Sequence, residues 1–305
     1  MKTVIDALLA WFSVHGRDLP WRNTQDPYAI LVSEYMLQQT QVQRVIPYYH
    51  AWMKVFPTWR VLADAPTRLV LERWSGLGYN RRALALQSLA QHVAQHGEPT
   101  SPEGWQTLKG IGPYTAAAVS AFSRQQAVLP IDTNIRRLLG RLLLGIPFPT
   151  PQDDAALHAA TASWLAHPRF FDVPQALFDV AATICKKRPA CASCPLQAQC
   201  SLSTSFLAGN ISIPKRSIKK AQESRHNEKP HPDRIYRGRI LKLLRTHTRE
   251  TRRTIGAKTD PDFDPIADTE WISRMIDRLI KDGLVHEEDG FLKFGPSDAL
   301  TNHAL

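Results

Sequence analysis

The sequence is poor in cysteine and in long apolar runs. Only four of its 305 residues are cysteine, and all four lie between positions 185 and 200. Disulfide-rich secreted domains spread their cysteines along the chain, so this clustering excludes such a scaffold and favours a metal or cluster site. No apolar run reaches membrane-spanning length, and the N-terminus lacks a basic-then-apolar signal pattern. We therefore expect a cytoplasmic protein without a membrane partner.

Alternating strand patterns are also absent before residue 205. Instead, apolar residues recur at helical spacing through most of this region. The expected helices are residues 27–39, 41–56, 69–74, 81–95, 103–108, 135–144, 153–166 and 172–184. The first 204 residues should therefore form a mainly α-helical body.

The net charge of +10 is unevenly distributed. Residues 1–210 hold 19 basic and 13 acidic side chains, residues 211–258 hold 15 and 4, and residues 259–305 hold 4 and 11. A strongly basic middle segment suggests a polyanionic partner, because phosphate contacts supply most non-specific affinity for DNA. A solvated linker would have a similar composition.

The stretch from 108 to 137 carries the most informative pattern. It reads LKGIGPYTAAAVSAF at residues 108–122 and VLPIDTNIRR at residues 128–137. Gly110 and Gly112 permit a tight turn with bare backbone amides, and Pro113 suits the first position of a helix. Amides at a helix N-terminus can hold a phosphate. The turn is therefore either a DNA phosphate site or an ordinary corner between two helices.

Glu34 and Asp132 are two carboxyl groups in contrasting settings. Glu34 shares one helical face with Ile30 and Leu37, and a carboxyl on a mostly apolar face is costly to bury as an anion. Asp132 precedes a helical pattern, so it can cap that helix, whose terminal amides favour the ionised form. A partly exposed surface glutamate and a purely structural cap are the simpler interpretations.

The cysteines follow the spacing Cys185-x5-Cys191-x2-Cys194-x5-Cys200. Four thiolates on one short loop suit either a tetrahedral zinc ion or a [4Fe–4S] cluster. Either group would serve a structural role first, and the basic residues at 186–188 could then face phosphates. The pattern indicates no open metal position for hydrolysis.

The pattern Leu-x-Gly-Ile-Gly-x-Tyr-Thr-Ala, followed by an aspartate before a basic helix, resembles the helix-hairpin-helix DNA glycosylase superfamily. Four further segments are similar to its MutY-type adenine glycosylases: LPWR at 19–22, DPY at 26–28, VSEYMLQQTQV at 32–42 and VIPY at 45–48. The resemblance covers roughly residues 1–200. It implies a mainly α, two-lobed fold with an iron–sulfur cluster loop. The six-helix lobe would span about 24–128, and the cluster lobe about 1–23 and 129–204.

The resemblance also implies the chemistry. Hydrolysis of an N-glycosidic bond needs a proton donor for the departing base and an anion beside the cationic sugar. Glu34 would protonate adenine and later handle water, Asp132 would stabilise the sugar, and Tyr114 and Asn134 would assist them. The residues implied at the base pocket and on the DNA are Arg22, Leu37, Gln38, Gln39, Val42, Tyr79, Gly110 and Gly112. The substrate would be double-stranded DNA, from which a mismatched adenine must be flipped out.

Position 114 and the cysteine spacing refine this expectation. In the lyase relatives that resemble endonuclease III, the residue at this position is a lysine that attacks the sugar. Tyr114 cannot form a Schiff base, so a monofunctional glycosylase is expected. The family's cluster spacing is x6, x2, x5, so the first interval here is one residue shorter. A [4Fe–4S] cluster on Cys185, Cys191, Cys194 and Cys200 is still expected, with zinc as the alternative.

Residues 205–305 do not resemble the Nudix-like domain with which MutY-type enzymes read 8-oxoguanine opposite adenine. A polar, basic and proline-punctuated composition predicts a linker at 205–232. Helical patterns at 235–244 and 269–281 precede a hairpin pattern at 282–294. This order is typical of a winged-helix-like module, expected at 233–297. A small α+β cap without a DNA role is the alternative.

The expected function is base-excision repair by a monomeric enzyme, associated with the nucleoid if the source is bacterial. The enzyme would remove adenine mispaired with 8-oxoguanine or guanine. One alternative keeps the chemistry and changes the base, to thymine or uracil opposite guanine. Another is a non-catalytic iron–sulfur DNA-binding protein. A pure binder needs neither Glu34 nor Asp132, which argues against that alternative.

Overall fold

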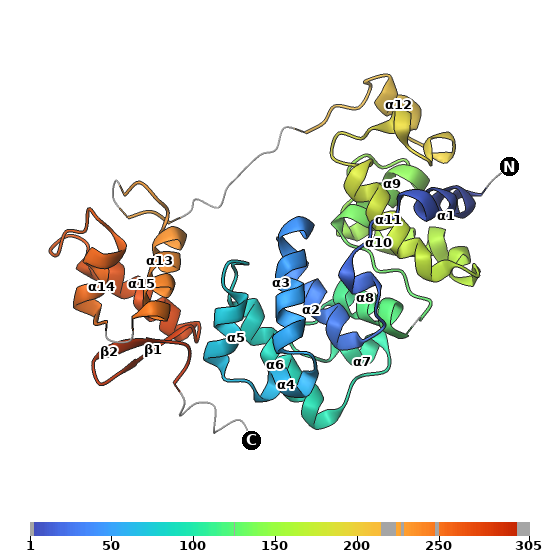
Figure 1. Ribbon diagram of the computed structural model, residues 1–305. Coiled ribbons are helices and arrows are strands. Elements are labelled where there is room, and N and C mark those ends of the chain that lie inside the picture. Colours follow the sequence, from blue (N-terminus) through green and yellow to red (C-terminus); the bar gives the residue numbers. More distant parts are fainter. Residues whose placement is uncertain (1–2, 125, 215–223, 227–228, 248–249, 298–305) are drawn as a thin grey trace. The chain divides into compact units, whose positions relative to one another are not determined.

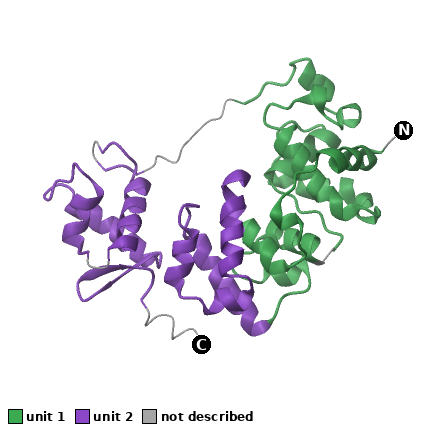
Figure 2. Ribbon diagram, in the orientation of Figure 1, with its two compact units in different colours: residues 1–34, 97–216 green, residues 35–96, 217–305 purple. Residues whose placement is uncertain are grey.

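The computed structural model describes residues 3–124, 126–214, 224–226, 229–247 and 250–297, and these are mainly helical (Figure 1). The chain divides into two compact units (Figure 2). Unit 1 comprises residues 1–34 and 97–216, and unit 2 comprises residues 35–96 and 217–305. The two lobes expected from the family resemblance stay a prediction.

The described part of unit 1 consists of helices and short connecting turns. Thr3 accepts the N–H of Asp6 at the start of the first helix, and Asp132 caps another helix in the same way. Such side chains satisfy N–H groups that have no partner within the helix. The helices are α1 (Val4–His15), α2 (Pro27–Leu37), α7 (Pro102–Gln106), α8 (Pro113–Arg124), α9 (Thr133–Leu143), α10 (Asp154–Thr161), α11 (Val173–Thr183) and α12 (Ser203–Leu207), of which α2 continues into unit 2. Turns of 3-10 helix lie at Pro20–Arg22, Pro151–Asp153, Ala162–Ala166, Phe170–Asp172, Cys191–Ser193 and Gln197–Gln199.

One apolar core lies among α1, α9 and α11 (Figure 1). Leu8, Leu139 and Leu177 are fully buried in it, and burial of a side chain of this size contributes about 1.5–3 kcal/mol. The core also includes Cys185 and Leu196, so it anchors the cysteine loop. This packing gives the start of α9, which carries Asp132, a rigid support.

The first part of unit 2 holds α3 (Val42–Val55), α4 (Trp59–Asp64), α5 (Thr67–Trp74) and α6 (Arg81–His96). The ring of Trp52 lies edge-on to those of Phe56 and Trp74, with centroid distances of 4.8 and 5.4 Å. All three rings are almost completely buried. This aromatic cluster joins α3 to α5 and supports the turn at residues 75–80.

The C-terminal part of unit 2 contains three helices and a hairpin in its described residues. They are α13 (Asp233–Thr246), α14 (Arg252–Thr259), α15 (Thr269–Lys281), β1 (Val285–Glu288) and β2 (Phe291–Phe294). The strands are antiparallel with Val285 opposite Phe294, and Glu250 adds a bridge to Leu292. The sequence pattern predicts two of these helices and the hairpin. It misses α14, in which Ile255 is the one large apolar residue.

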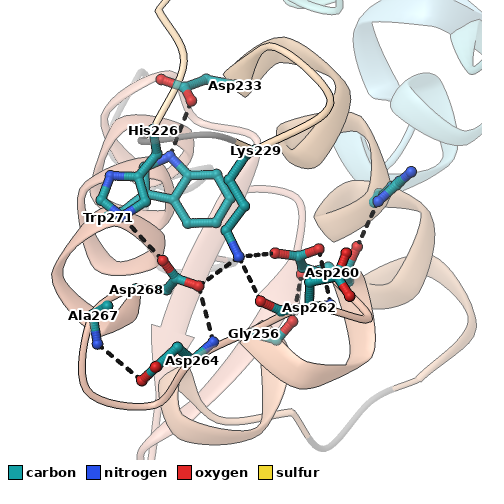
Figure 3. Close-up of polar contacts among 12 residues, drawn as sticks. His226, Lys229, Asp233, Gly256, Asp260, Asp262, Asp264, Ala267, Asp268 and Trp271 are labelled. Carbon is teal, nitrogen blue, oxygen red and sulfur yellow. Dashed lines mark hydrogen bonds and ion pairs between the residues drawn. The ribbon is translucent and has the colours of Figure 1, made fainter.

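A buried charge network holds this C-terminal part together (Figure 3). The ammonium of Lys229 lies 2.7 Å from a carboxylate oxygen of Asp260 and 2.6 Å from one of Asp268. His226 lies 3.0 Å from Asp268 and stacks on Trp271 with a centroid distance of 4.9 Å. Burial alone would raise the pKa of Asp268, but the hydrogen bond from Lys229 lowers it below its usual value. The two acids therefore share one cation.

Several expected boundaries are corrected by the structure. The helix expected at 27–39 ends at Leu37, because Gln39 adopts left-handed backbone with a φ of 56°. The helix expected at 153–166 is α-helical only to Thr161 and then tightens into a 3-10 turn. The predicted linker at 205–232 includes residues 215–223 and 227–228, which lie outside the described residues. No helix within the described ranges is long and apolar enough to cross a membrane.

Candidate active site

Glu34 and Tyr114 lie at the centre of the candidate site in unit 1. Glu34 follows the buried residues 28–33 of α2, and Tyr114 lies in the first turn of α8. The hydroxyl of Tyr114 donates a hydrogen bond to the Glu34 carboxyl. Burial raises the pKa of Glu34 to about 7 despite this hydrogen bond, and the Asp132 anion raises it further. A carboxyl with such a pKa is well placed to donate a proton near neutral pH.

Asp132 caps the N-terminus of α9. Its Oδ1 accepts the N–H groups of Asn134 and Ile135 at 2.8 and 2.7 Å, and its Oδ2 accepts the side-chain amide of Asn134 at 2.6 Å. Three N–H donors stabilise the charged form of a carboxylate. The capping and catalytic interpretations of Asp132 are therefore compatible. One set of contacts serves both.

Tyr114 is a neutral hydrogen-bond donor in this setting. Burial and the two nearby carboxyl groups, Glu34 and Asp132, raise the pKa of its hydroxyl well above the ordinary value. Its ring packs edge-on against Phe178, with a centroid distance of 6.4 Å. The hydroxyl therefore holds the Glu34 carboxyl in place without a charge of its own.

A polar chain connects Asp132 with the cysteine loop. Asn134 donates to Asp132 and accepts a hydrogen bond from Nη1 of Arg137 at 3.2 Å. Nε of Arg137 donates to the carbonyl of Cys185 at 2.8 Å, and its Nη2 donates to the carbonyl of Ala181 at 3.0 Å. The first cysteine is thus linked to the predicted catalytic aspartate through two side chains. Sequence reasoning missed Arg137, because its acceptors are mostly backbone carbonyls.

Arg22 lies in a buried ion pair. Its Nη1 and Nη2 donate to the carboxylate of Asp179 at 2.9 and 2.8 Å, and Arg17 donates to the same carboxylate at 2.6 Å. Burial alone would raise the pKa of Asp179, but the hydrogen bonds from both arginines lower it. Asp179 is fully buried on α11, and it was missed because nothing in the sequence marks it as a partner. The predicted contact of Arg22 with the base stays a prediction.

Gly110 and Gly112 differ in what they require. Gly110 has a φ of 93°, which side chains other than glycine rarely adopt. A Cβ atom on Gly112 would meet nothing within 4 Å. The turn therefore needs Gly110 for its backbone, whereas Gly112 leaves an open approach to the start of α8. Such an approach agrees with the predicted phosphate contact.

The remaining predicted DNA contacts lie in unit 2. Gln38 and Gln39 are exposed directly after α2, while Leu37 and Val42 are partly buried. Tyr79 is 64% exposed in the turn that precedes α6. Gln39 and Tyr79 both have left-handed backbone, with φ of 56° and 49°, which costs about 1–3 kcal/mol for a residue other than glycine. Strain of this kind concentrates at functional sites.

The four cysteines line one cavity together with apolar side chains. Leu138, Ile184 and Phe206 are among its other lining residues, and none of the lining residues is a histidine or a carboxylate. Burial raises the pKa of Cys194 to about 11 and also raises that of Cys185, which Arg141 opposes. Four cysteine thiols without a histidine or carboxylate ligand beside them suit a soft metal or an iron–sulfur cluster. Within the described ranges, no three potential ligands lie close enough to hold a single ion.

Arg141 lies beneath the cysteine loop and is almost completely buried. It donates to the carbonyls of Pro147, Lys186 and Lys187 at 2.9, 2.7 and 3.3 Å, and its Nη1 lies 3.7 Å from Sγ of Cys185. A buried cation here stabilises negative charge on the sulfurs. Sequence reasoning missed this residue, although an arginine inside the apolar run LLGRLLLG at 138–145 was a usable signal.

Comparison with known proteins identifies the family. The model of the HhH-GPD superfamily of base excision DNA repair proteins matches residues 32–161. The chain is 36% identical over 286 residues to the adenine DNA glycosylase of Mycolicibacterium smegmatis, and the match covers 92% of each chain. The human adenine DNA glycosylase is 37% identical over 208 residues, which cover 64% of this chain and 38% of the human one.

The mycobacterial match extends the resemblance beyond the residues that first indicated it. A match over 92% of 305 residues must include most of the chain after residue 205. The adenine DNA glycosylase of Mycobacterium tuberculosis agrees, with 35% identity over 288 residues that cover 91% of this chain and 88% of that one. The C-terminal part is therefore shared with these relatives.

Solved structures show the same fold. A thermostable thymine-DNA glycosylase superposes with a TM-score of 0.61 and 26% identity, covering 66% of this chain and 95% of that one. A non-covalent endonuclease III–DNA complex gives 0.56 at 19% identity, covering 68% and 100%. The adenine-specific relatives have the higher identity, so the thymine alternative is not favoured. The chain therefore belongs to the adenine DNA glycosylases, N-glycosyl hydrolases of base-excision repair within the HhH-GPD superfamily.

Proposed function

We propose that this glycosylase removes adenine mispaired with 8-oxoguanine or guanine in double-stranded DNA, as a monomer and without strand cleavage. The observation that carries the proposal is the asymmetry of two neighbouring carboxyl groups. Glu34 has a pKa of about 7, and Asp132 accepts three N–H donors. One group can deliver a proton while the other remains an anion.

The geometry supports a two-stage hydrolysis. The C1′–N9 bond breaks with its electron pair passing to adenine, and the adenine ring takes up the proton of Glu34. The Asp132 carboxylate stabilises the cationic sugar that remains, as a fixed negative charge beside it. The Glu34 carboxylate then accepts a proton from water as the water oxygen bonds to C1′. Tyr114 orients Glu34 throughout.

The absence of strand cleavage follows from the residue at position 114. A lyase step requires an amine that forms a Schiff base with the sugar. Tyr114 has no amine, and its hydroxyl donates to Glu34. Lys109 precedes the hairpin, in the segment between α7 and α8. Strand cleavage after base removal should therefore need added base or a separate enzyme.

A panel of labelled duplexes tests this proposal. Adenine opposite 8-oxoguanine and adenine opposite guanine should be excised under single-turnover conditions, and thymine or uracil opposite guanine should remain intact. Products should be cut only after alkali treatment. Excision of thymine or uracil at a rate equal to that of adenine would contradict the adenine specificity. Strand breaks without alkali would contradict the monofunctional step.

We also propose that Cys185, Cys191, Cys194 and Cys200 hold one [4Fe–4S] cluster. The shared cavity of sulfur and apolar groups and the adjacent guanidinium of Arg141 support it. When bound, such a cluster cross-links the loop and stabilises its fold. Purified protein should be brown, absorb broadly near the blue edge of the visible range, and contain iron and sulfide. One zinc per chain without iron would contradict the proposal.

The C-terminal part, residues 233–297, is proposed to be a winged-helix-like module that adds affinity for DNA. Three helices followed by a hairpin, with the extra bridge from Glu250 to Leu292, support this topology. The basic residues of the preceding segment and of α13 provide charge for phosphate contacts. No carboxyl of the module is proposed to take part in adenine chemistry. The proposed role of the module is therefore DNA binding, whereas the proposed role of Glu34 is proton transfer.

A further inference from the structure

Arg82, the second residue of α6, donates hydrogen bonds to two separate turns. Its Nη1 donates to the carbonyls of Tyr35 and Met36 at 2.7 and 3.2 Å and also to that of Gln38. Tyr35 and Met36 belong to the last turn of α2, where carbonyl groups have no partner within the helix. One guanidinium therefore caps α2 and holds the first residue of the turn that follows it.

The other side of the same guanidinium holds a second turn. Nη2 of Arg82 donates to the carbonyl of Gly78 at 3.1 Å and to that of Leu77 at 3.4 Å. It also reaches the hydroxyl of Thr40 at 3.4 Å. Arg82 thus connects residues 35–40 with residues 77–78 through hydrogen bonds to both.

Two aromatic rings enclose this cation. The guanidinium carbon of Arg82 lies 5.3 Å from the ring centroid of Trp74 and 5.4 Å from that of Tyr79. Trp74 is buried and donates its Nε1–H to the carbonyl of Gly78 at 3.1 Å. Burial lowers the pKa of Arg82, and the proximity of Tyr79 opposes that effect. The Tyr79 ring is therefore held by a cation–π contact on one side while most of it remains exposed.

The two turns share an unusual backbone. Gln39 and Tyr79 are two of the three residues other than glycine that have positive φ in the described chain. Each follows a residue whose carbonyl accepts a hydrogen bond from Arg82, namely Gln38 and Gly78. Strained conformations persist only where surrounding contacts impose them. Arg82 supplies such contacts to both.

We propose that Arg82 is a positioning residue that presents Gln39 and Tyr79 together as a preformed wedge for the opened base pair. The inference rests on the proposed roles of these two residues at the DNA. Extraction of a base leaves a gap in the stack, and an exposed tyrosine ring beside an exposed amide can fill such a gap only if both are held ready.

A lysine cannot replace this arrangement. The planar guanidinium reaches acceptors on two segments while its faces contact two rings, whereas an ammonium is a point charge with three donors. Arg82→Lys should keep the positive charge and lose the hydrogen bonds that connect residues 35–40 with residues 77–78. Arg81→Lys is the matched control, because Arg81 is the preceding residue on α6 and its side chain is 77% exposed.

The test measures base extraction separately from chemistry. In a Glu34→Gln background, 2-aminopurine replaces the target adenine, and its fluorescence rises when it leaves the stack. In this background, Arg82→Lys should slow the fluorescence rise by about tenfold or more, because small misplacements of positioning groups carry such costs. In a protein with Glu34 intact, Arg82→Lys should slow single-turnover excision of adenine by a similar factor. Arg81→Lys should match the parent protein. Equal extraction by both variants, in proteins of equal thermal stability, would overturn the proposal.

A double-mutant cycle covers the case in which Arg82→Lys is itself unstable. If Arg82 acts through Tyr79, the effect of Arg82→Lys on extraction should largely disappear in a Tyr79→Ala background. A general structural role predicts the same effect in both backgrounds and would overturn the proposal. If the unmodified protein excised adenine from none of the mismatched duplexes, that result would instead contradict the proposed function. The two failures are thus distinguishable.

Discussion

The helical body, residues 3–214, differs in its buried acids from the C-terminal module (233–297) taken together with the residues at 224–226 and 229–232 that precede it; hereafter, the module includes those residues. In the module, Asp260 and Asp268 share Lys229, and the buried Glu250 pairs with Lys258 at 2.6 Å. In the body, Glu34 forms no ion pair with a lysine or arginine of the described residues. Burial is the main cause of its pKa of about 7, the hydrogen bond from Tyr114 lowers that pKa, and the carboxylate of Asp132 raises it.

The difference separates acids that stabilise the fold from the acid to which we assign the proposed proton transfer. Asp179, the fully buried acid of the body, is paired with Arg17 and Arg22. Glu34 is therefore an exception within its own domain as well as in comparison with the module. A carboxyl in an apolar setting lowers stability once it ionises, which supports the functional role that we propose for Glu34.

The largest effect should come from Glu34→Gln. Glutamine keeps the shape of the side chain and cannot deliver the proton, so single-turnover excision should fall by roughly 10²–10⁴. Binding to a mismatched duplex should stay within a few-fold. Glu72→Gln, an exposed acid on α5 that pairs with Arg68, is the control and should excise normally. If Glu34→Gln excised adenine at nearly the rate of the unmodified protein, Glu34 would not be the proton donor, and its contrast with the paired acids of the module would have no functional meaning.

Much of this site was predictable from residues alone. The glycines before Pro113 and the aspartate before a basic helix are patterns of neighbouring residues, which can be recognised from the sequence without the structure. Arg82, Arg137 and Arg141 were not found, because their partners are mainly backbone carbonyls that any residue provides. The helix α14 was missed for a related reason. It is stabilised by the burial of Ile255 and by capping through Thr251, not by an apolar stripe of its own.

The module's paired acids can be unpaired by Lys229→Met. This substitution leaves Asp260 and Asp268 buried without their shared cation, and breaking such a pair costs about 3–5 kcal/mol. The module should unfold at a lower temperature, while excision at saturating enzyme should remain unchanged. Lys242→Met, at an exposed position of α13, is the matched control. Loss of excision in parallel with the module's melting would show that the module takes part in the chemistry.

The cost of keeping Glu34 should appear in the pH dependence of stability. Its pKa is raised from 4.5 to about 7 in the folded state, so the native protein binds the extra proton between these values. The stability that the folded state has with a neutral Glu34 carboxyl is fully present below pH 4.5 and is lost as the pH rises through about 7. Relative to the unmodified protein, Glu34→Gln should therefore gain about 1–3 kcal/mol at pH 8 and nothing at pH 4.5. Denaturant titrations at both pH values test this, and an equal effect at both would contradict the raised pKa.

The smallest effect concerns a groove of about 270 Å³ in the module, lined by Arg225, Arg237, Arg274 and Arg278. Of these four, only Arg274 forms an ion pair among the described residues, with Glu270. The others are available to phosphates, and each lost phosphate contact lowers the salt slope of DNA binding by about 0.9. The Arg237→Gln, Arg278→Gln double variant should therefore bind the duplex more weakly, with a slope reduced by up to about 2.

The matched control for this groove removes the same charge elsewhere in the module. Lys242 and Arg253 are exposed and lie outside the groove, so the Lys242→Gln, Arg253→Gln double variant should change the slope less. Excision by both double variants should be normal at saturating enzyme, because neither alters Glu34 or Asp132. Equal slopes in both variants would mean that the module attracts DNA only through its net charge. A loss of excision confined to the groove variant would mean that the module positions the substrate for Glu34. DNA binding by the module and catalysis by the helical body would then not be separate functions.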